Sequence, residues 1–443
     1  MIRAAPPGGK GAPRSAREES GLSGRGGAAP PDYLGGPTRP LDARMASVRP
    51  FRALRPAPEH AEHVASVPYD VVSAAEAREL AAGNPRSFLH VVRPEIDLPE
   101  GTDEHDDAVY AKGAENLRAL AESDAFVREE APSLYVYRLV MNGRSQTGVV
   151  GLVSVEEYDA GRILRHEDTR PDKEDDRTRH VVAQRAHAEP VMLTYRGQRA
   201  IDDLVAAAME GEPVYDFRAK DYVEHTVWRL PDPDALVAAF ADVDALYVAD
   251  GHHRSAAASR AAAETGDEGA AHFLAVLFPY DDMEILPYNR VVRELPVGPG
   301  KFLEQLRRKF EVEEALFPDP DDYGVVAFYL GMDYGWNTLV RPETERDGVA
   351  DTLDVARLAE FVLEPMLGIT DPRTDENVAF VGGIRGTEEL ERLVDSGEAE
   401  VAFSMFPTAP EDLLDVSDAG ERMPPKSTWF EPKLRSGLLV HTF

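Results

Sequence analysis

The segment ALYVADGHHRSAAASRAAAETG (245–266) carries charged and imidazole side chains at a point where an apolar strand runs directly into a helix. A glycine at position 251 lets the chain turn tightly, and the following helix presents free backbone N–H groups and the positive end of its dipole. Such a turn binds anions, phosphate above all. We therefore predict a phosphate site formed by Gly251, His252, His253 and Arg254.

Asp250, at the end of the same strand, is predicted to hold Mg²⁺ or to orient a histidine. Adjacent histidines point in different directions on a helix, so we do not expect His252 and His253 to share a metal. The alternative for the whole segment is an aspartate cap on an alanine-rich helix with two surface histidines.

A second set of charges lies in RHEDTRPDKEDDRTRH (165–180), where eleven of sixteen residues are charged. The expected helix 170–189 has a stripe without carboxylates, because spacings of 4, 3, 4 and 3 separate Lys173, Arg177, His180, Gln184 and His187. Together with Arg170 just before it, this stripe is suited to clamp a polyanionic ligand. The alternative is a solvated helix held by salt bridges.

Two further segments give weaker signals. In MPPKSTWFEPK (423–433), Lys426 and Ser427 have groups that bind phosphate, but no glycine-rich loop precedes them, so this is not a P-loop. In SVPYDVVS (66–73), Pro68 fixes a turn that presents Tyr69 and Asp70, and Asp70 and Glu95 are candidate general bases. The motifs GxGxxG, GxSxG and HExxH do not occur, so serine-hydrolase and zincin functions lack support.

The elements that must position these residues alternate in a mixed α+β order. Apolar alternation predicts strands at 133–141, 147–158, 191–196, 272–279 and 283–292, the first two joined by an Asn-Gly turn and the last two paired with each other. Helical periodicity and caps predict helices at 73–83, 108–123, 252–266 and 298–310. We expect a main catalytic region over 45–295 and a C-terminal region over 296–443 that packs on it and contributes to the site.

Residues 1–44 are rich in Gly, Pro, Ala and Arg without apolar periodicity, and we expect a disordered extension upstream of the true start at Met45. The chain has 443 residues, a formal net charge of −32 and no cysteine. Thiolate chemistry and disulfides are thereby excluded. So acidic a chain repels nucleic acid, and no apolar run is long enough for a membrane span. Acid excess with scarce lysine is typical of a halophilic, salt-adapted proteome. We expect a cytoplasmic protein.

Several motifs together resemble one family. VPYDVVS, NPRSFLHVVRPE, RHEDTRPDKEDDRTRHV, YVADGHHRSAAA and MPPKSTWFEPK are similar to the family called domain of unknown function 1015, from about Met45 to the C-terminus. LPYNRVV departs from its pattern, since Tyr288 and Asn289 stand where a Thr-His pair is expected. The DGHHR segment is also similar to free serine kinases of the ParB/sulfiredoxin-like fold, which implies a phosphate-binding core of that type.

That resemblance implies a Mg²⁺-dependent transfer of a phosphoryl group from ATP, ADP or pyrophosphate to free L-serine. In this hypothesis the turn with Asp250 and His253 binds the donor, and the remaining basic residues clamp its oxygens. A carboxylate takes the hydroxyl proton, and both Asp70 and Glu167 qualify. Two alternatives remain open: a phosphoserine or pyrophosphate hydrolase with water as the acceptor, and a nucleotide-binding regulatory protein without catalysis. The sequence leaves the oligomeric state open.

Overall fold

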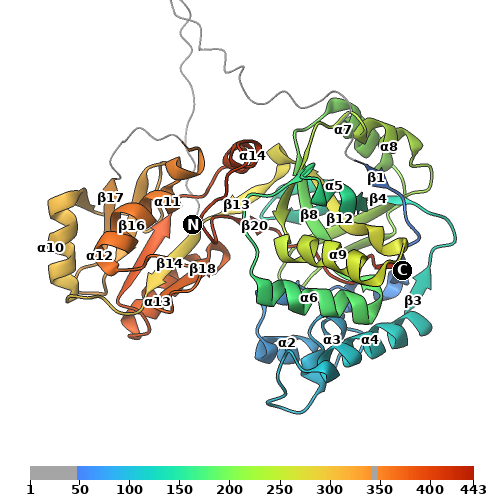
Figure 1. Ribbon diagram of the computed structural model, residues 1–443, viewed down its shortest axis with the longest axis horizontal. Coiled ribbons are helices and arrows are strands. Elements are labelled where there is room, and N and C mark those ends of the chain that lie inside the picture. Colours follow the sequence, from blue (N-terminus) through green and yellow to red (C-terminus); the bar gives the residue numbers. More distant parts are fainter. Residues whose placement is uncertain (1–46, 341–347) are drawn as a thin grey trace, which may run out of the picture. The chain divides into compact units, whose positions relative to one another are not determined.

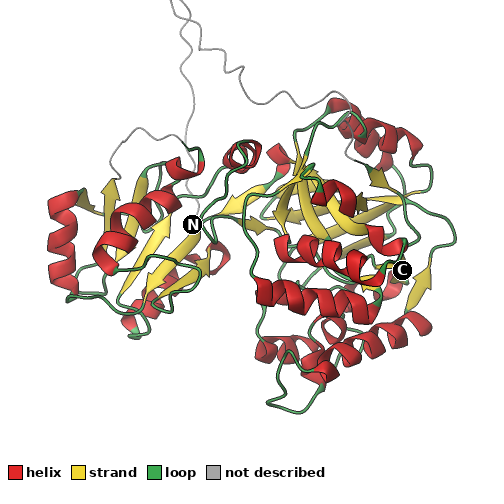
Figure 2. Ribbon diagram, viewed as in Figure 1, coloured by secondary structure: helices red, strands yellow, loops and turns green. Residues whose placement is uncertain are grey.

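The computed structural model of the chain describes residues 47–340 and 348–443 (Figure 1). The predicted extension 1–44 lies outside these residues. The described elements form two main sheets, each accompanied by helices (Figure 2). The mixed α+β class with a strand–DGHHR–helix unit is therefore confirmed.

The larger sheet has nine strands within the described residues, in the order β6-β11-β8-β12-β5-β4-β10-β9, with β1 paired to β5. The pairs β6–β11 and β8–β12 are parallel. Its strands are β1 (Val48–Arg49), β4 (Leu134–Met141), β5 (Arg144–Ser154), β6 (Ile163–Leu164), β8 (Val191–Tyr195), β9 (Tyr215–Arg218), β10 (Glu224–Leu230), β11 (Leu246–Asp250) and β12 (His272–Pro279).

Both faces of this sheet are buried, because alternate side chains of its central strands enter different hydrophobic clusters. On β12, Phe273, Ala275 and Leu277 pack in one cluster, and Leu274, Val276 and Phe278 pack in the other. The accompanying helices are α1 (Ala61–Val64), α2 (Ala74–Ala81), α3 (Leu89–Val92), α4 (Asp107–Glu122), α5 (Val155–Asp159), α6 (Pro171–Gln184), α7 (Arg199–Ala208), α8 (Asp234–Phe240) and α9 (His252–Thr265). Helices α6 and α9 lie side by side (Figure 1).

The second sheet is antiparallel, with the strand order β15-β17-β16-β19-β14-β18 in the described part of the chain. Its strands are β14 (Tyr288–Val292), β15 (Glu311–Glu314), β16 (Val325–Tyr329), β17 (Trp336–Val340), β18 (Val378–Gly382) and β19 (Val401–Met405). Its helices are α10 (Pro299–Lys309), α11 (Asp354–Leu358), the π-helix η7 (Ala359–Leu363), α12 (Glu364–Leu367), α13 (Gly386–Asp395) and α14 (Pro410–Asp418). This sheet already begins at β14, shortly before the boundary at 295 that we predict for the domains.

After α14 the chain returns to the larger sheet and its surroundings. Strand β20 (Trp429–Glu431) pairs with β13 (Glu284–Leu286), and β21 (His441–Thr442) pairs with β7 (Ala186–His187). Isolated bridges join Ser436 to Ser66 and Val440 to Leu54. A further pair joins β2 (Leu54–Pro56) to β3 (Phe126–Arg128). The C-terminal residues are thereby fixed against segments that precede them by more than 140 positions.

Local sequence signals are confirmed where caps and turns set the structure. Ser73 caps α2 in a reciprocal capping box with Glu76. Asn142 and Gly143 join β4 to β5 with φ angles of 52° and 81°, the left-handed pair that a two-residue hairpin requires. Helices α4, α9 and α10 lie within one residue or two of their predicted bounds.

Three sequence predictions are wrong. The strand predicted over 147–158 ends at Ser154, and the residues after it belong to helix α5. Residues 272–279 do not pair with 283–292, because β12 lies between β5 and β8 while β14 enters the second sheet after Pro287. The helix predicted over 170–189 ends at Gln184, since Arg185 adopts a left-handed conformation with φ 53°. His187 therefore lies on β7 and not on the helical stripe.

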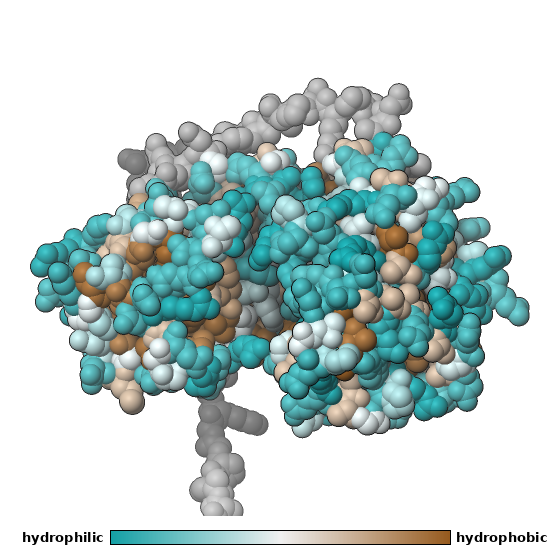
Figure 3. Space-filling view, turned by 60° about the horizontal axis from the view of Figure 1, so that its bottom comes forward, coloured by the Kyte–Doolittle hydropathy of each residue, from teal (hydrophilic) through white to brown (hydrophobic). Residues whose placement is uncertain are grey.

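Hydrophilic residues cover most of the face drawn in Figure 3. Among the described residues, no helix combines the length and the apolar character that crossing a membrane requires.

We predict that His187 makes stability depend on pH. Burial and the nearby His441 lower the pKa of His187 to about 3. Below the unfolded pKa of about 6.5, the unfolded chain binds a proton that the native chain does not. The free energy of unfolding should therefore fall as pH falls from 6.5 toward 3, by about 2 kcal/mol at pH 5 from this residue.

Urea denaturation at several pH values measures this effect. His187→Asn should make the loss of stability between pH 7 and pH 5 shallower by about that amount. His63→Asn, which changes an exposed histidine on α1, is the matched control and should leave the slope unchanged. An unchanged slope in His187→Asn would contradict the assignment.

Candidate functional site

The candidate site lies where two parallel neighbours, β6 and β11, end at the same edge of the larger sheet. Ile163 lies opposite Leu246 and Leu164 opposite Tyr247. Because parallel strands leave a sheet at the same edge, the residues after β6 come to lie beside the turn after β11. Side chains at such an edge are well placed to bind ligands.

The turn itself depends on Gly251. Its φ of 101° lies in the left-handed region, where a side chain is strained. A Cβ at this position would lie 2.9 Å from Nε of Arg254. The tight turn lets α9 begin at His252, directly after the strand, so that its first N–H groups stand at the sheet edge.

Asp250 is held by two cations. Its Oδ2 accepts a hydrogen bond from Nζ of Lys433 at 3.2 Å and lies 3.6 Å from Nη2 of Arg254. Burial opposes ionisation, but Lys433 and Arg254 hold the pKa of Asp250 well below its usual range. The carboxylate is therefore ionised throughout the physiological range.

A buried polar layer lies beneath the turn and centres on Glu189. Its Oε1 accepts hydrogen bonds from the backbone N–H of Tyr69 at 3.1 Å and from Ser436 Oγ at 3.0 Å. Oε2 lies 3.8 Å from Nη1 of Arg177, and Arg254 donates to the carbonyl of Pro190. Burial raises the pKa of Glu189, against the effect of Arg254 and Arg177. A cavity of about 40 Å³, with room for a water or two, adjoins these side chains.

The stripe on α6 divides between this interior and the surface. Arg177 is 7% exposed, pairs with Asp176 and stacks on the ring of Tyr69 at 3.8 Å. His180 is 6% exposed and contacts the ring of Tyr110. Arg177 and His180 thus belong to a buried network, whereas Lys173 is only partly buried.

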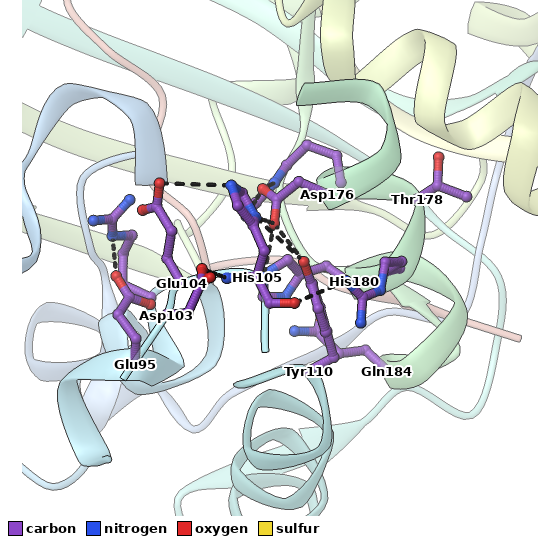
Figure 4. A network of polar contacts seen from close by, with 12 residues as sticks. Glu95, Asp103, Glu104, His105, Tyr110, Asp176, Thr178, His180 and Gln184 are labelled. Atoms are coloured by element: carbon purple, nitrogen blue, oxygen red, sulfur yellow. Dashed lines mark hydrogen bonds and ion pairs between the residues drawn. The ribbon is translucent and has the colours of Figure 1, made fainter. Parts of the chain in front are cut away.

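Figure 4 shows the part of this network around Asp176, which accepts a hydrogen bond from Tyr110 Oη at 2.9 Å and lies 3.2 Å from Nδ1 of His105. Asp176 neighbours Arg177 in sequence and lies off the predicted stripe. Asp176 therefore neutralises Arg177 from a position beside the stripe, although the stripe itself contains no carboxylate.

Arg170 precedes the first residue of α6 and is exposed, and its side chain makes no capping hydrogen bond. Its backbone N–H donates to Nε2 of His253 at 3.1 Å, and its guanidinium pairs with Asp172. Burial and the ammonium of Lys426 lower the pKa of His253. The turn before α6 and the start of α9 are thus joined directly at the candidate site.

Lys426 is an exposed residue in a left-handed conformation with φ 58°. Its backbone carbonyl accepts a hydrogen bond from buried Arg290 at 3.1 Å, and its ammonium lies 5.5 Å from the centre of the Tyr288 ring. Desolvation opposes its charge, but Tyr288, Glu167, Asp70 and Asp250 raise the pKa of Lys426. The three candidate carboxylates therefore share one electrostatic environment with this lysine.

Ser427 has a different environment, since it is 2% exposed and its Oγ donates to the carbonyl of Pro424 at 2.6 Å. Asn289, at the position where the sequence departs from the family pattern, accepts a hydrogen bond from the backbone N–H of Met405. Both side chains hold the backbone around the site.

The two candidate bases differ in their contacts. Asp70 is exposed, and its carboxylate makes neither a hydrogen bond nor an ion pair with any other residue that the structure describes. Glu167 is partly buried, and burial raises its pKa against the opposing effect of Lys426. His166, Glu167 and His252 offer ligand atoms that all lie within 4.8 Å of one another.

Three residues of this region were missed by the sequence analysis. Lys433 belongs to the quoted segment 423–433, so its charge was the available signal. Glu189 and His166 carry no signal of their own, because their partners come from distant segments.

The family model described as "Protein of unknown function (DUF1015)" matches residues 48–356. A search of curated proteins finds no match. Three solved structures resemble 66% of this chain: a free serine kinase in complex with AMP (14% identity, 91% of that chain, TM-score 0.35), a conserved hypothetical protein from Pyrococcus furiosus (14%, 95%, 0.36) and a C-terminally truncated SbnI from Staphylococcus aureus (13%, 87%, 0.37). At this level of similarity they assign no activity to the chain.

We predict that Gly251→Ala destabilises the protein more than Gly266→Ala does. Both glycines have positive φ angles, and the left-handed conformation alone costs alanine about 1–2 kcal/mol. A Cβ at 266 meets open space, whereas a Cβ at 251 displaces a guanidinium held by Pro190 and Asp250. Urea denaturation should show the difference, and equal losses would contradict the close fit between Gly251 and Arg254.

Proposed function

The chain belongs to the family described as protein of unknown function (DUF1015), and on that premise we propose that it is a phosphotransferase. The donor is a nucleotide or pyrophosphate, with ADP, ATP and pyrophosphate as candidates. The acceptor is the hydroxyl of a small metabolite, most readily free L-serine. The observation that carries the proposal is that Arg170 donates a hydrogen bond to His253 in the first turn of α9, where the charges of Lys426 and of the unpaired Asp70 also act.

The donor phosphates would bind at the N-terminus of α9, behind Gly251. Free N–H groups and the helix dipole favour a phosphate there. Lys426, Arg170 and Lys173 would contact the outer oxygens, since these three cationic residues are exposed or partly buried. His253 and Arg254 would add hydrogen-bond donors from the helix itself.

In this proposal Arg177 and His180 do not contact the phosphate oxygens directly. Both are buried beneath the turn, and Arg177 pairs with Asp176 and stacks on Tyr69. They would position the turn that carries Asp70, while Ser427 would hold the backbone that presents Lys426.

We assign the general base to Asp70. Its carboxylate is exposed and unpaired among the described residues, and its charge acts on both His253 and Lys426. The hydroxyl oxygen of the acceptor forms a bond to phosphorus while the bond from phosphorus to the bridging donor oxygen breaks. The hydroxyl proton passes to Asp70, and the electron pair leaves with AMP, ADP or orthophosphate, according to the donor.

The residues present also fit a magnesium ion. Asp250 supplies a hard carboxylate oxygen of the kind that Mg²⁺ prefers, since the contacts with Lys433 and Arg254 both involve Oδ2. Asp250 would hold the ion together with phosphate oxygens of the donor. When bound, the ion supplies charge neutralisation to the transferred group.

The first prediction from this proposal is formation of phosphoserine. ³¹P NMR follows separate reactions of the full chain with Mg²⁺, L-serine and ATP, ADP or pyrophosphate. A phosphoserine signal with any one donor supports the proposal and identifies that donor. Free phosphate without phosphoserine indicates a hydrolase instead. No turnover with any donor, in a sample that binds nucleotide, would indicate a regulatory protein and contradict the proposal.

A second prediction concerns the base. Asp70→Asn should lower kcat by about 10²–10⁴-fold, because the proton then lacks an acceptor. KM should change little, since the amide keeps the shape of the side chain. Glu167→Gln is the matched comparison and should retain more activity than Asp70→Asn.

Chemical rescue separates a base from a structural residue. Formate should restore part of the activity of Asp70→Gly and none of that of Glu167→Gln. Full activity in Asp70→Asn, or rescue confined to a Glu167 variant, would move the base to Glu167.

A further inference from the structure

We propose that His166, Glu167 and His252 form a binding site for a divalent first-row transition-metal ion of the zinc type. This site is separate from the place of Mg²⁺ at Asp250. One nitrogen from each imidazole and one carboxylate oxygen would bind the ion, and at least one coordination position would stay open. The inference concerns metal binding and holds whether or not the chain transfers phosphate.

The three ligand groups are already close. Their candidate ligand atoms all lie within 4.8 Å of one another. In tetrahedral coordination, with metal–ligand bonds of 2.0–2.1 Å, two ligand atoms are about 3.3 Å apart. The ligand atoms would therefore have to approach one another by at most about 1.5 Å to complete the set.

Each histidine has one buried ring nitrogen without a hydrogen-bond partner among the described residues, although the backbone of Val248 lies close enough to His166 to favour its charged form. His166 is 1% exposed and His252 is 7% exposed. Nδ1 of His166 and Nε2 of His252 are buried and have no hydrogen-bond partner among the residues that the structure describes. The two rings meet edge to face, with centroids 4.5 Å apart. Buried polar atoms are normally satisfied, so two such nitrogens beside a carboxylate point to a bound group that takes both.

The surroundings fix His166 in the manner of a metal ligand. Its Nε2 lies 3.4 Å from Oγ1 of Thr428, and its backbone carbonyl accepts a hydrogen bond from Met423 N–H at 2.7 Å. Ligating histidines commonly bond a second group through the other ring nitrogen, which fixes the tautomer and the orientation. Here the C-terminal segment provides both contacts.

The ligand chemistry selects the class of ion. Two imidazoles with one carboxylate suit zinc and its first-row neighbours, whereas Mg²⁺ prefers oxygen ligands alone. The charge of Asp250 favours a cation here, while Lys426 beside Glu167, Arg422 beside His166 and Arg165 beside His252 oppose one. The open position would take a water molecule or an anionic oxygen of a ligand.

Metal binding to the full-length protein tests the inference without donor or acceptor. The chain is stripped with a chelator, and Zn²⁺ binding is measured by calorimetry and Co²⁺ binding by its visible absorption. We expect one ion per chain and a Co²⁺ spectrum typical of nitrogen ligands. Millimolar Mg²⁺ should not displace the ion.

Variants locate the ion. His166→Asn and His252→Asn should each weaken binding at least tenfold, and Glu167→Gln should weaken it as well. Thr428→Val should have a smaller effect, because it removes only a group that orients His166. His253→Asn is the matched control, one position further along α9, and should keep the affinity of the unmodified chain. Circular dichroism checks that each variant is folded.

Several results would overturn the inference. If the folded protein takes up no Zn²⁺ or Co²⁺, water satisfies the two nitrogens and no metal site exists. If Mg²⁺ displaces the ion, or if folded His166→Asn and Glu167→Gln bind it as tightly as the unmodified chain, the ion binds elsewhere. Because no phosphate is transferred in this experiment, its failure is distinct from failure of the proposed activity.

Discussion

The ion pairs of Asp250 are the contacts on which the whole candidate site depends. Arg254 reaches this carboxylate from the first turn of α9, and Lys433 reaches it from a position 183 residues later in the chain. A largely buried carboxylate without a cation costs several kcal/mol. The return of the C-terminal segment to the larger sheet is therefore needed to neutralise the turn. The same return brings Lys426 to the carboxylates and Thr428 to His166.

Glu189 has a similar role one layer deeper. It accepts hydrogen bonds from Tyr69 and Ser436 and lies beside Arg177, so it joins the turn of Asp70, the C-terminal segment and α6. Buried ion pairs add little net stability, but breaking one leaves an uncompensated charge in the interior. The network thus penalises any arrangement in which these three segments are displaced. It can fix the position of Asp70 although none of its members needs to touch a ligand.

The sequence predicts features that depend on neighbouring residues, and it does not predict contacts between segments that are far apart in the chain. The strand–Gly251–helix unit and the capping box at Ser73 are local, and residue types at short spacing determine them. The contact between His166 and His252 depends on β6, a strand of only two residues that leaves no periodic signal. Likewise, nothing near Arg185 in the sequence marks the left-handed residue that ends α6 before His187. Asp176 and Glu189 neutralise Arg177, but Asp176 lies beside the stripe on α6 and Glu189 lies beyond the end of the helix. A helical projection of the stripe therefore does not show them.

In so acidic a chain, the proposed phosphate site requires that the cations near the ligand outweigh the negative net charge of the whole protein. The formal charge is −32, yet two of the eight lysines fall within residues 423–433, beside Arg254 and the free N–H groups of α9. At an ionic strength of 0.1 M, exposed charges separated by more than about 10 Å are largely screened. A small phosphate compound at the turn would therefore experience mainly the nearby cations. A long nucleic acid would extend over the acidic surface and be repelled there. This difference favours a small phosphorylated ligand over a polymer as the occupant of the proposed donor site.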